Sequence, residues 1–203
     1  MMPRRGVPAL LLCLLATTGL VYSGCATEPV TRLYVLTPLT QQESPLNTAN
    51  TEGLAIGIGP VQLPQYTSRP AIVTEDSSYE LYSAAWAHWA EPLQDNFVRV
   101  LAENLSQLLA TDRVALFPWN NPLPLDYQII VEVTHFLGKT GGDVSLVALW
   151  SVIGKDGKAV LVSKKARFRE PTASQEYAAL AAAMSRAVAA LSRDIAGTII
   201  TLQ

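Results

Sequence analysis

Cysteine and histidine are nearly absent from this sequence, which holds two of each among its 203 residues. Cys13 lies in an apolar N-terminal stretch that export would remove, so Cys25 would be left alone and no internal disulfide could form. His88 and His135 have no group of carboxylates or thiolates around them at metal-ligand spacing. We therefore expect no disulfide framework, no metal site and no cofactor.

The motifs of common enzyme classes are also missing. There is no Gly-x-Ser-x-Gly nucleophile elbow. Gly57-x-Gly59 precedes Pro60 instead of a helix, which excludes a dinucleotide-binding turn. Glu75, Asp76 and Glu91 are carboxylates, but nothing near them in the sequence would raise their pKa. We expect a protein that is not an enzyme. A periplasmic hydrolase that uses His88 with a serine or carboxylate is the alternative.

What is present begins with an export signal over residues 1–24. Arg4 and Arg5 precede an apolar stretch from Val7 to Val21, and small residues follow it. This stretch is shorter than the about 20 apolar residues that span a bilayer. Because Gly6, Val7 and Pro8 do not extend a twin-arginine motif, general secretion is the expected route.

The signal ends in a motif that is similar to a bacterial lipobox, Ser23-Gly24-Cys25. In that motif diacylglycerol acylates the cysteine, which becomes the mature N-terminus. Tyr22 departs from the pattern, since Leu, Val or Ile is usual there. We expect a lipid on Cys25, a short leash over residues 25–31, and anchoring by two or three acyl chains. Ordinary cleavage that leaves a free Cys25 is the alternative.

The charge balance limits the partners. The signal contains two of the 15 basic residues and none of the 17 acidic ones, so the mature chain is acidic, with a net charge of −4. No basic run is visible, so we expect no nucleic-acid partner. Ala26 stands where an aspartate would retain the protein at the inner membrane of a Gram-negative cell. The expected location is the periplasmic face of the outer membrane.

Residues 32–203 are expected to form a single α+β domain. Alternating or apolar runs predict a series of strands. A hairpin turn is expected at 155–158, because Asp156-Gly157 suits a tight turn. Gly57 and Gly59 suggest a bulge or a close approach of backbones. The predicted strands cover residues 32–37, 54–61, 71–74, 79–82, 113–117, 127–136, 144–153 and 159–168.

Two long helices complete this fold. Pro92 suits a first helical turn, and an apolar stripe follows it from Leu93 to Leu109. Asp95, Arg99 and Glu103 are spaced for ion pairs on the opposite side. The last helix is expected to begin near Thr172, in a capping box with Gln175, and to carry a stripe from Tyr177 to Ile199. We predict a mixed or antiparallel sheet with both helices packed on one face.

Two stretches suggest a surface for a partner or for self-association. One is the proline-rich run 59–70, and the other is 86–92, with two tryptophans before a helix. Tyr, Trp and Arg are favoured at interaction hot spots. The alternative is that the prolines shape a loop and that a tryptophan fills the core. The candidate residues are Pro60, Leu63, Pro64, Tyr66, Arg69, Trp86, Trp89 and Glu91.

These stretches resemble the PqiC (YmbA-like) lipoproteins, auxiliary components of ABC-type transport systems that carry MCE-domain proteins. A second block is similar too, Trp89-Ala90-Glu91-Pro92-Leu93 followed by Arg99-Val100-Leu101-Ala102-Glu103-Asn104-Leu105, and so is Tyr34-Val35-Leu36 after the cysteine. The first block reads Ile56-Gly57-Ile58-Gly59-Pro60-Val61-x-Leu63-Pro64-x-Tyr66-x-x-Arg69-Pro70-x-Ile72-Val73.

The resemblance implies a non-enzymatic outer-membrane lipoprotein that works with a membrane-anchored MCE protein to move lipids between two membranes. It also implies a domain that self-associates in a ring and docks the end of an MCE tunnel. A lipoprotein that binds a lipid or peptide by itself is the alternative function.

Overall fold

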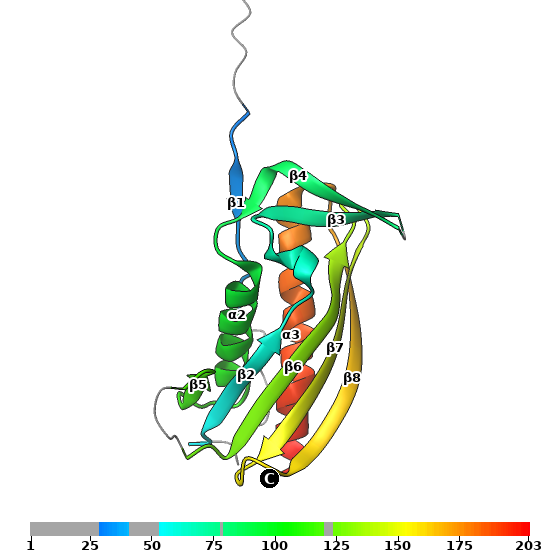
Figure 1. The fold of residues 1–203 in the computed structure, drawn as a ribbon. Coiled ribbons are helices and arrows are strands. Elements are labelled where there is room, and N and C mark those ends of the chain that lie inside the picture. The colour runs from blue at the N-terminus through cyan, green and yellow to red at the C-terminus, as the bar shows by residue number, and fades with distance from the viewer. Residues whose placement is uncertain (1–28, 41–52, 78, 120–123) are drawn as a thin grey trace, which may run out of the picture. The chain divides into compact units, whose positions relative to one another are not determined.

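The computed structural model describes residues 29–40, 53–77, 79–119 and 124–203, and one compact unit covers Thr31–Gln203. The signal peptide and Cys25 lie outside the described residues. Within the unit, a five-stranded sheet, a three-stranded sheet and two helices form one α+β domain, which confirms the predicted fold class (Figure 1).

The large sheet is mixed, as predicted, and its strand order is β5-β2-β6-β7-β8. β2 (Ile56–Gln62) is parallel to both β5 (Val114–Leu116) and β6 (Tyr127–Gly138). β6, β7 (Asp143–Gly154) and β8 (Val160–Pro171) form an antiparallel meander. The β7–β8 turn lies where Asp156-Gly157 predicts it. The Asp156 carboxylate accepts the backbone N–H groups of Lys158 and Ala159, which lowers its pKa.

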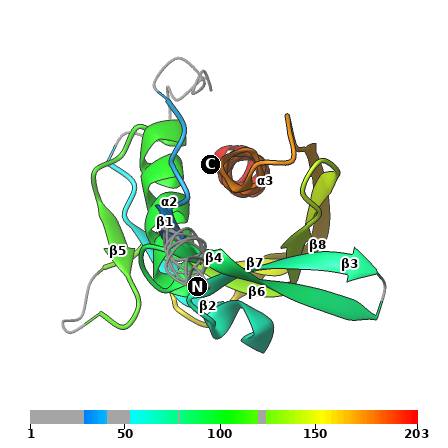
Figure 2. The ribbon, with the colours of Figure 1, turned by 90° about the horizontal axis from the view of Figure 1, so that it is seen from above.

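Both helices pack on one face of this sheet, as Figure 2 shows from above. In α2 (Leu93–Leu108) the predicted stripe is buried, because its apolar residues recur at the helical period. In α3 (Tyr177–Thr201) the apolar stripe is joined by buried alanines at 181, 183, 187, 189 and 196. These small side chains let α3 approach the sheet and α2 closely.

The start of α3 corrects one prediction. The helix begins at Tyr177, and no side chain caps its N-terminus. The predicted capping box does not form because Thr172 is engaged elsewhere. Its backbone N–H and its hydroxyl both donate to the carbonyl of Gly142, in the β6–β7 turn. This pair of hydrogen bonds keeps the chain extended after β8.

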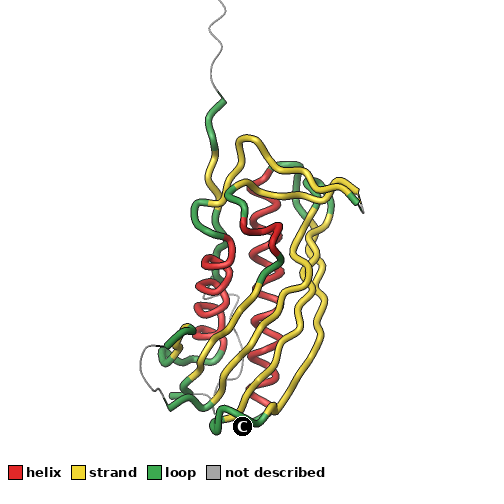
Figure 3. The backbone as a smooth tube through the Cα atoms, viewed as in Figure 1, coloured by secondary structure: helices red, strands yellow, loops and turns green. Residues whose placement is uncertain are grey.

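A second, three-stranded sheet was not predicted as a separate layer. Its order is β1-β4-β3, formed by β1 (Arg32–Tyr34), β3 (Ala71–Ser77) and β4 (Glu80–Trp89). Pro64 and Pro70 flank a 3-10 turn, η2 (Gln65–Ser68), that separates β2 from β3. Figure 3 shows the small sheet crossing the end of the domain at which α3 begins.

Both features expected at the glycines of β2 are observed. The register of β2 on β6 shifts between Ile58 and Val61, as at a bulge. A Cβ on Gly57 would lie 2.5 Å from Leu125 Cδ1. Gly59 has a φ of +120°, and a Cβ there would lie 2.6 Å from Phe117 Cβ. Glycine is therefore required at position 59, where the strand meets the chain after β5.

Candidate functional site

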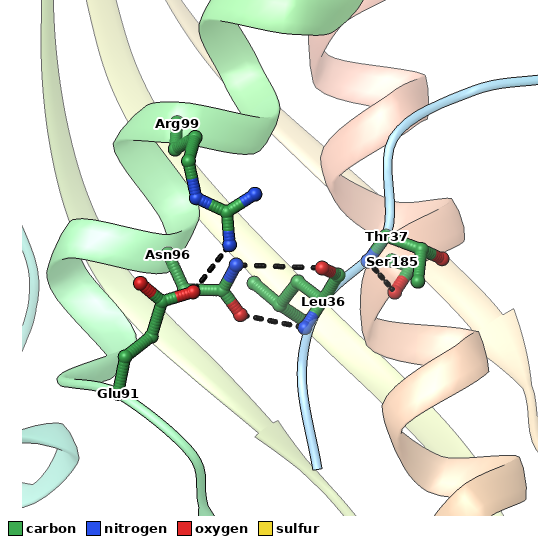
Figure 4. Close-up of polar contacts among 6 residues, drawn as sticks. All are labelled: Leu36, Thr37, Glu91, Asn96, Arg99 and Ser185. Carbon is green, nitrogen blue, oxygen red and sulfur yellow. Dashed lines mark hydrogen bonds and ion pairs between the residues drawn. The ribbon is translucent and has the colours of Figure 1, made fainter.

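The residues that follow β1 form an extended strap, Val35–Thr40, which leads back along the chain toward Cys25. Leu36 and Leu39 are buried in the domain core. The strap lies between α2 and α3, because its backbone is bound by side chains from both helices (Figure 4). It has no strand partner, so these side chains satisfy groups that a sheet would otherwise pair.

Asn96 of α2 holds Leu36 through both of its backbone groups. Asn96 Oδ1 accepts the Leu36 N–H at 2.6 Å, and Asn96 Nδ2 donates to the Leu36 carbonyl at 3.3 Å. The Asn96 side chain thus acts like the edge of a neighbouring strand. On the other side, the Thr37 N–H donates to the Ser185 hydroxyl of α3 at 3.1 Å.

A second asparagine, Asn104, binds the strap about two turns further along α2. The Leu39 N–H donates to Asn104 Oδ1 at 2.7 Å, and Asn104 Nδ2 donates to the Ser192 hydroxyl at 3.1 Å. Asn104 and Ser192 are both fully buried. This second contact ties the strap to α2 and α2 to α3. The strap, which follows β1 directly, is therefore fixed inside the domain.

Sequence analysis missed Asn96 and Asn104, although a signal was present. Both positions lie on the apolar stripe of α2, next to Phe97 and Leu105, where a polar side chain must find a buried partner. Two asparagines eight residues apart on a buried face indicate a polar seam. The groups that these asparagines bind could not be predicted from the sequence, because they are backbone groups, which every residue has.

The first predicted block is divided between structural and surface roles. Tyr66 is half-buried, and its hydroxyl accepts the Phe136 N–H at 2.9 Å beside a bulge in β6. Burial raises the pKa of Tyr66. Leu63 packs partly buried against the core, and Pro64 precedes η2. Arg69 is exposed.

Pro60 lies in a shallow groove of about 470 Å³ between β2, α2 and the end of β5. Both polar and apolar side chains line it, with Gln94, Asp95 and Val98 contributed by α2. β5 pairs only with Ile56–Ile58, so the groove runs along β2 where β5 no longer covers it. It is the place in the first block where another molecule could bind beside a strand.

The residues of the second stretch, 86–92, are also divided between the core and the surface. Trp89 is 7% exposed and belongs to the core, whereas Trp86 is 52% exposed at the surface. Glu91 forms an ion pair with Arg99, which corrects the expected pairing of Arg99 with Asp95 and Glu103 (Figure 4). Glu103 instead accepts a hydrogen bond from Gln107. The expected partner surface stays a prediction, and Arg69 and Trp86 are its most accessible members.

Among the described residues, no three His, Cys, Asp or Glu side chains gather as metal ligands. His88 lies in β4 and His135 in β6, on different sheets. In the same part of the chain, no helix is long and apolar enough to cross a membrane.

The comparisons with known proteins decide the family. A family model described as "ABC-type transport auxiliary lipoprotein component" matches residues 34–196. The chain belongs to this family. The resemblance to PqiC-like lipoproteins, stated from the sequence blocks, is thereby confirmed, and the family is one of transport components instead of enzymes.

Solved structures share the fold of this auxiliary component. A crystal structure of an uncharacterized protein is 22% identical, with a TM-score of 0.66, over 83% of this chain and 99% of that one. A Xanthomonas campestris protein of the DUF330 family is 17% identical, with a TM-score of 0.61, over 84% and 91%. No curated protein matches the sequence.

Proposed function

We propose that this auxiliary lipoprotein is an outer-membrane subunit of an MCE-type intermembrane lipid transport system. A lipid on Cys25 holds it at the periplasmic face, where it docks or caps the end of the MCE tunnel and helps to maintain the envelope. The observation that carries the proposal is the family match over residues 34–196, joined to the lipobox motif of the sequence.

The strap supports this role because it suits an anchored adaptor. A pull from the lipid reaches β1 first, where the chain pairs with β4, and then the strap that follows it. Hydrogen bonds from both helices resist that pull, as does the burial of Leu36 and Leu39.

Attachment is tested by mass spectrometry of the membrane-extracted protein and by fractionation. We expect the first mature residue to be an acylated Cys25 and the protein to float with outer membranes. Cys25→Ala should release a folded domain into the periplasm, whereas Ala26→Asp should move the protein to the inner membrane. An unmodified sulfur on a protein that still sediments with membranes would contradict the proposal.

Docking is tested by cross-linking in cells with a photoreactive residue at exposed Arg69, and with a control at exposed Lys158 in the β7–β8 turn. We expect position 69 to capture an MCE-domain protein or a second copy of this chain, and position 158 to capture neither. Native mass of the extracted complex reports whether the copies form a ring. Recovery of no MCE protein under any condition would remove this partner.

The groove beside β2 favours a second candidate function, a stand-alone lipoprotein that binds a lipid or a peptide. Ile58, Val98 and Phe117 give the groove an apolar side, and the uncovered part of β2 offers backbone. Lipid or peptide that co-purifies with the wild type, but not with Val98→Trp, would favour this candidate. The same variant should leave docking to an MCE protein unchanged.

A further inference from the structure

The small sheet has one face turned into the domain and one face turned away from it. In β4, Ala84, Ala87 and Trp89 are buried, whereas Ala85 and Trp86 are exposed. Two neighbouring exposed residues between buried ones indicate a bulge, and the register of β3 on β4 shifts at this place. His88 pairs with Leu33 of β1, so His88, Leu33 and Trp86 share the outward face.

This outward face, which we call the outer face, carries large apolar side chains that are exposed. Leu33 is 65% exposed, Trp86 52% and Leu81 45%. Leu81 joins the face because it pairs with Glu75, two residues from Val73, which pairs with Ser83. The outer face carries His88 and Glu75 but no lysine. Scattered apolar residues are ordinary on a surface, whereas a continuous group of them marks a contact.

Chain length limits what can lie opposite the outer face. Leu33 follows Cys25 by eight residues, so a fully extended chain places the two at most about 28 Å apart. α3 begins next to the small sheet, where the ring centroids of Tyr177 and of Tyr34 in β1 are 6.3 Å apart. From there its 25 residues extend about 37 Å toward the other end of the domain. A lipid on Cys25 therefore holds Leu33 of the small sheet within about 28 Å of the anchored residue, whereas the far end of α3 can lie much further from it.

We propose that the outer face of the small sheet rests on the bilayer that holds Cys25, with Trp86 among the lipid headgroups. This inference rests on the proposed acylation of Cys25. Tryptophan is favoured at membrane interfaces because its ring is apolar and its N–H can bond to polar groups. The β3–β4 hairpin adds exposed Tyr79 at its tip, beside Asp76 and Glu80. The two carboxylates can stay hydrated in the headgroup layer. Moving them into the hydrocarbon core would be costly, so the hairpin should not insert more deeply.

The contact supplies orientation, since the acyl chains already supply attachment. A lipid on a flexible leash would let the domain turn freely. A second contact through the outer face holds the long axis of α3 away from the bilayer and presents the opposite end of the domain to the periplasm.

The test uses the full acylated protein in vesicles of phosphatidylethanolamine and phosphatidylglycerol that contain phosphatidylcholine brominated near the headgroup. Bromine quenches tryptophan fluorescence at short range. We expect the wild type to be quenched and Trp86→Phe to lose that quenching. Trp119→Phe is the matched control, because Trp119 lies after β5, away from the small sheet. It should keep the quenching.

Each outcome decides something. Equal quenching in Trp86→Phe and wild type would overturn the proposal while acylation and docking stand. The fluorescence of Trp86 could instead be blue-shifted to the same extent with and without vesicles. This result would also overturn the proposal, and it would indicate that the outer face contacts a second copy. A protein that carries no lipid on Cys25 and does not float would remove the proposed attachment and this inference together. Leu81→Ser, which keeps all tryptophans, should weaken the quenching of Trp86 if the face rests on lipid.

Discussion

Asn96 is the residue on which the strap depends most. Replacing it with alanine leaves the buried N–H and carbonyl of Leu36 without partners, and each unmet buried group costs roughly 1–3 kcal/mol. We expect Asn96→Ala to lower the free energy of unfolding by about 2 kcal/mol or more, measured by urea denaturation. Gln94→Ala, exposed on the same helix, should change it little. Equal stabilities of the two variants would contradict this role.

Tyr66 provides a second test at this scale, because its hydroxyl accepts the N–H of buried Phe136. Tyr66→Phe should cost about 1–2 kcal/mol in urea denaturation. Burial raises the pKa of Tyr66 above its unfolded value of 10.0. Its contribution is therefore fully present below pH 10 and is lost as the pH rises through the folded pKa. The wild type should lose stability more steeply above pH 10 than Tyr66→Phe does.

Two glycines with different surroundings predict opposite effects on thermal unfolding. Gly59 combines a φ of +120° with a close approach to Phe117, so Gly59→Ala should cost about 1–3 kcal/mol. Gly197 lies inside α3, and a Cβ there meets no atom within 4 Å. Gly197→Ala should therefore stabilise the protein by about 1 kcal/mol. Melting temperatures that move in the same direction would contradict the packing around one of the two sites.

At the scale of elements, the parts of the fold that follow a regular period could be predicted. The stripe from Leu93 to Leu109 and the meander of β6, β7 and β8 are observed where the sequence indicates them. β4 was predicted too short, because its bulge breaks the alternation of exposed and buried residues. α3 was predicted to start too early, because the hydrogen bonds of Thr172 to Gly142 join distant segments that local sequence does not reveal.

The candidate site was predicted only in part, for the same reason. A motif such as Ser23-Gly24-Cys25 is local and can be read directly. Trp86 and Trp89 have the same residue type but lie on opposite faces of β4, Trp86 on the outward face with His88 and Trp89 on the buried face with Ala87. The strap was not predicted, since its partners lie 60 or more residues away in the chain.

The strap also makes a prediction as an element. Hydrogen exchange should be slow at the backbone amides of Leu36 and Leu39, whose N–H groups are bound by buried asparagines. Leu33 lies in an edge strand of the small sheet, so its amide should exchange faster. In Asn104→Ala, protection should fall at Leu39 more than at Leu36. Uniformly fast exchange across residues 33–39 would show that the strap does not hold.

At the scale of the whole molecule, the strap decides where the folded domain begins. A chain that starts at Thr31 keeps β1 and the strap, whereas one that starts at Gln41 leaves the gap between α2 and α3 empty and buries Asn96 and Asn104 without their partners. We expect the first to unfold cooperatively at the temperature of the mature protein. The second should unfold at a clearly lower temperature or fail to fold, as followed by circular dichroism. Equal melting of both chains would mean that a pull on the lipid is not borne by the domain core, and the domain would then be an adaptor on a loose leash.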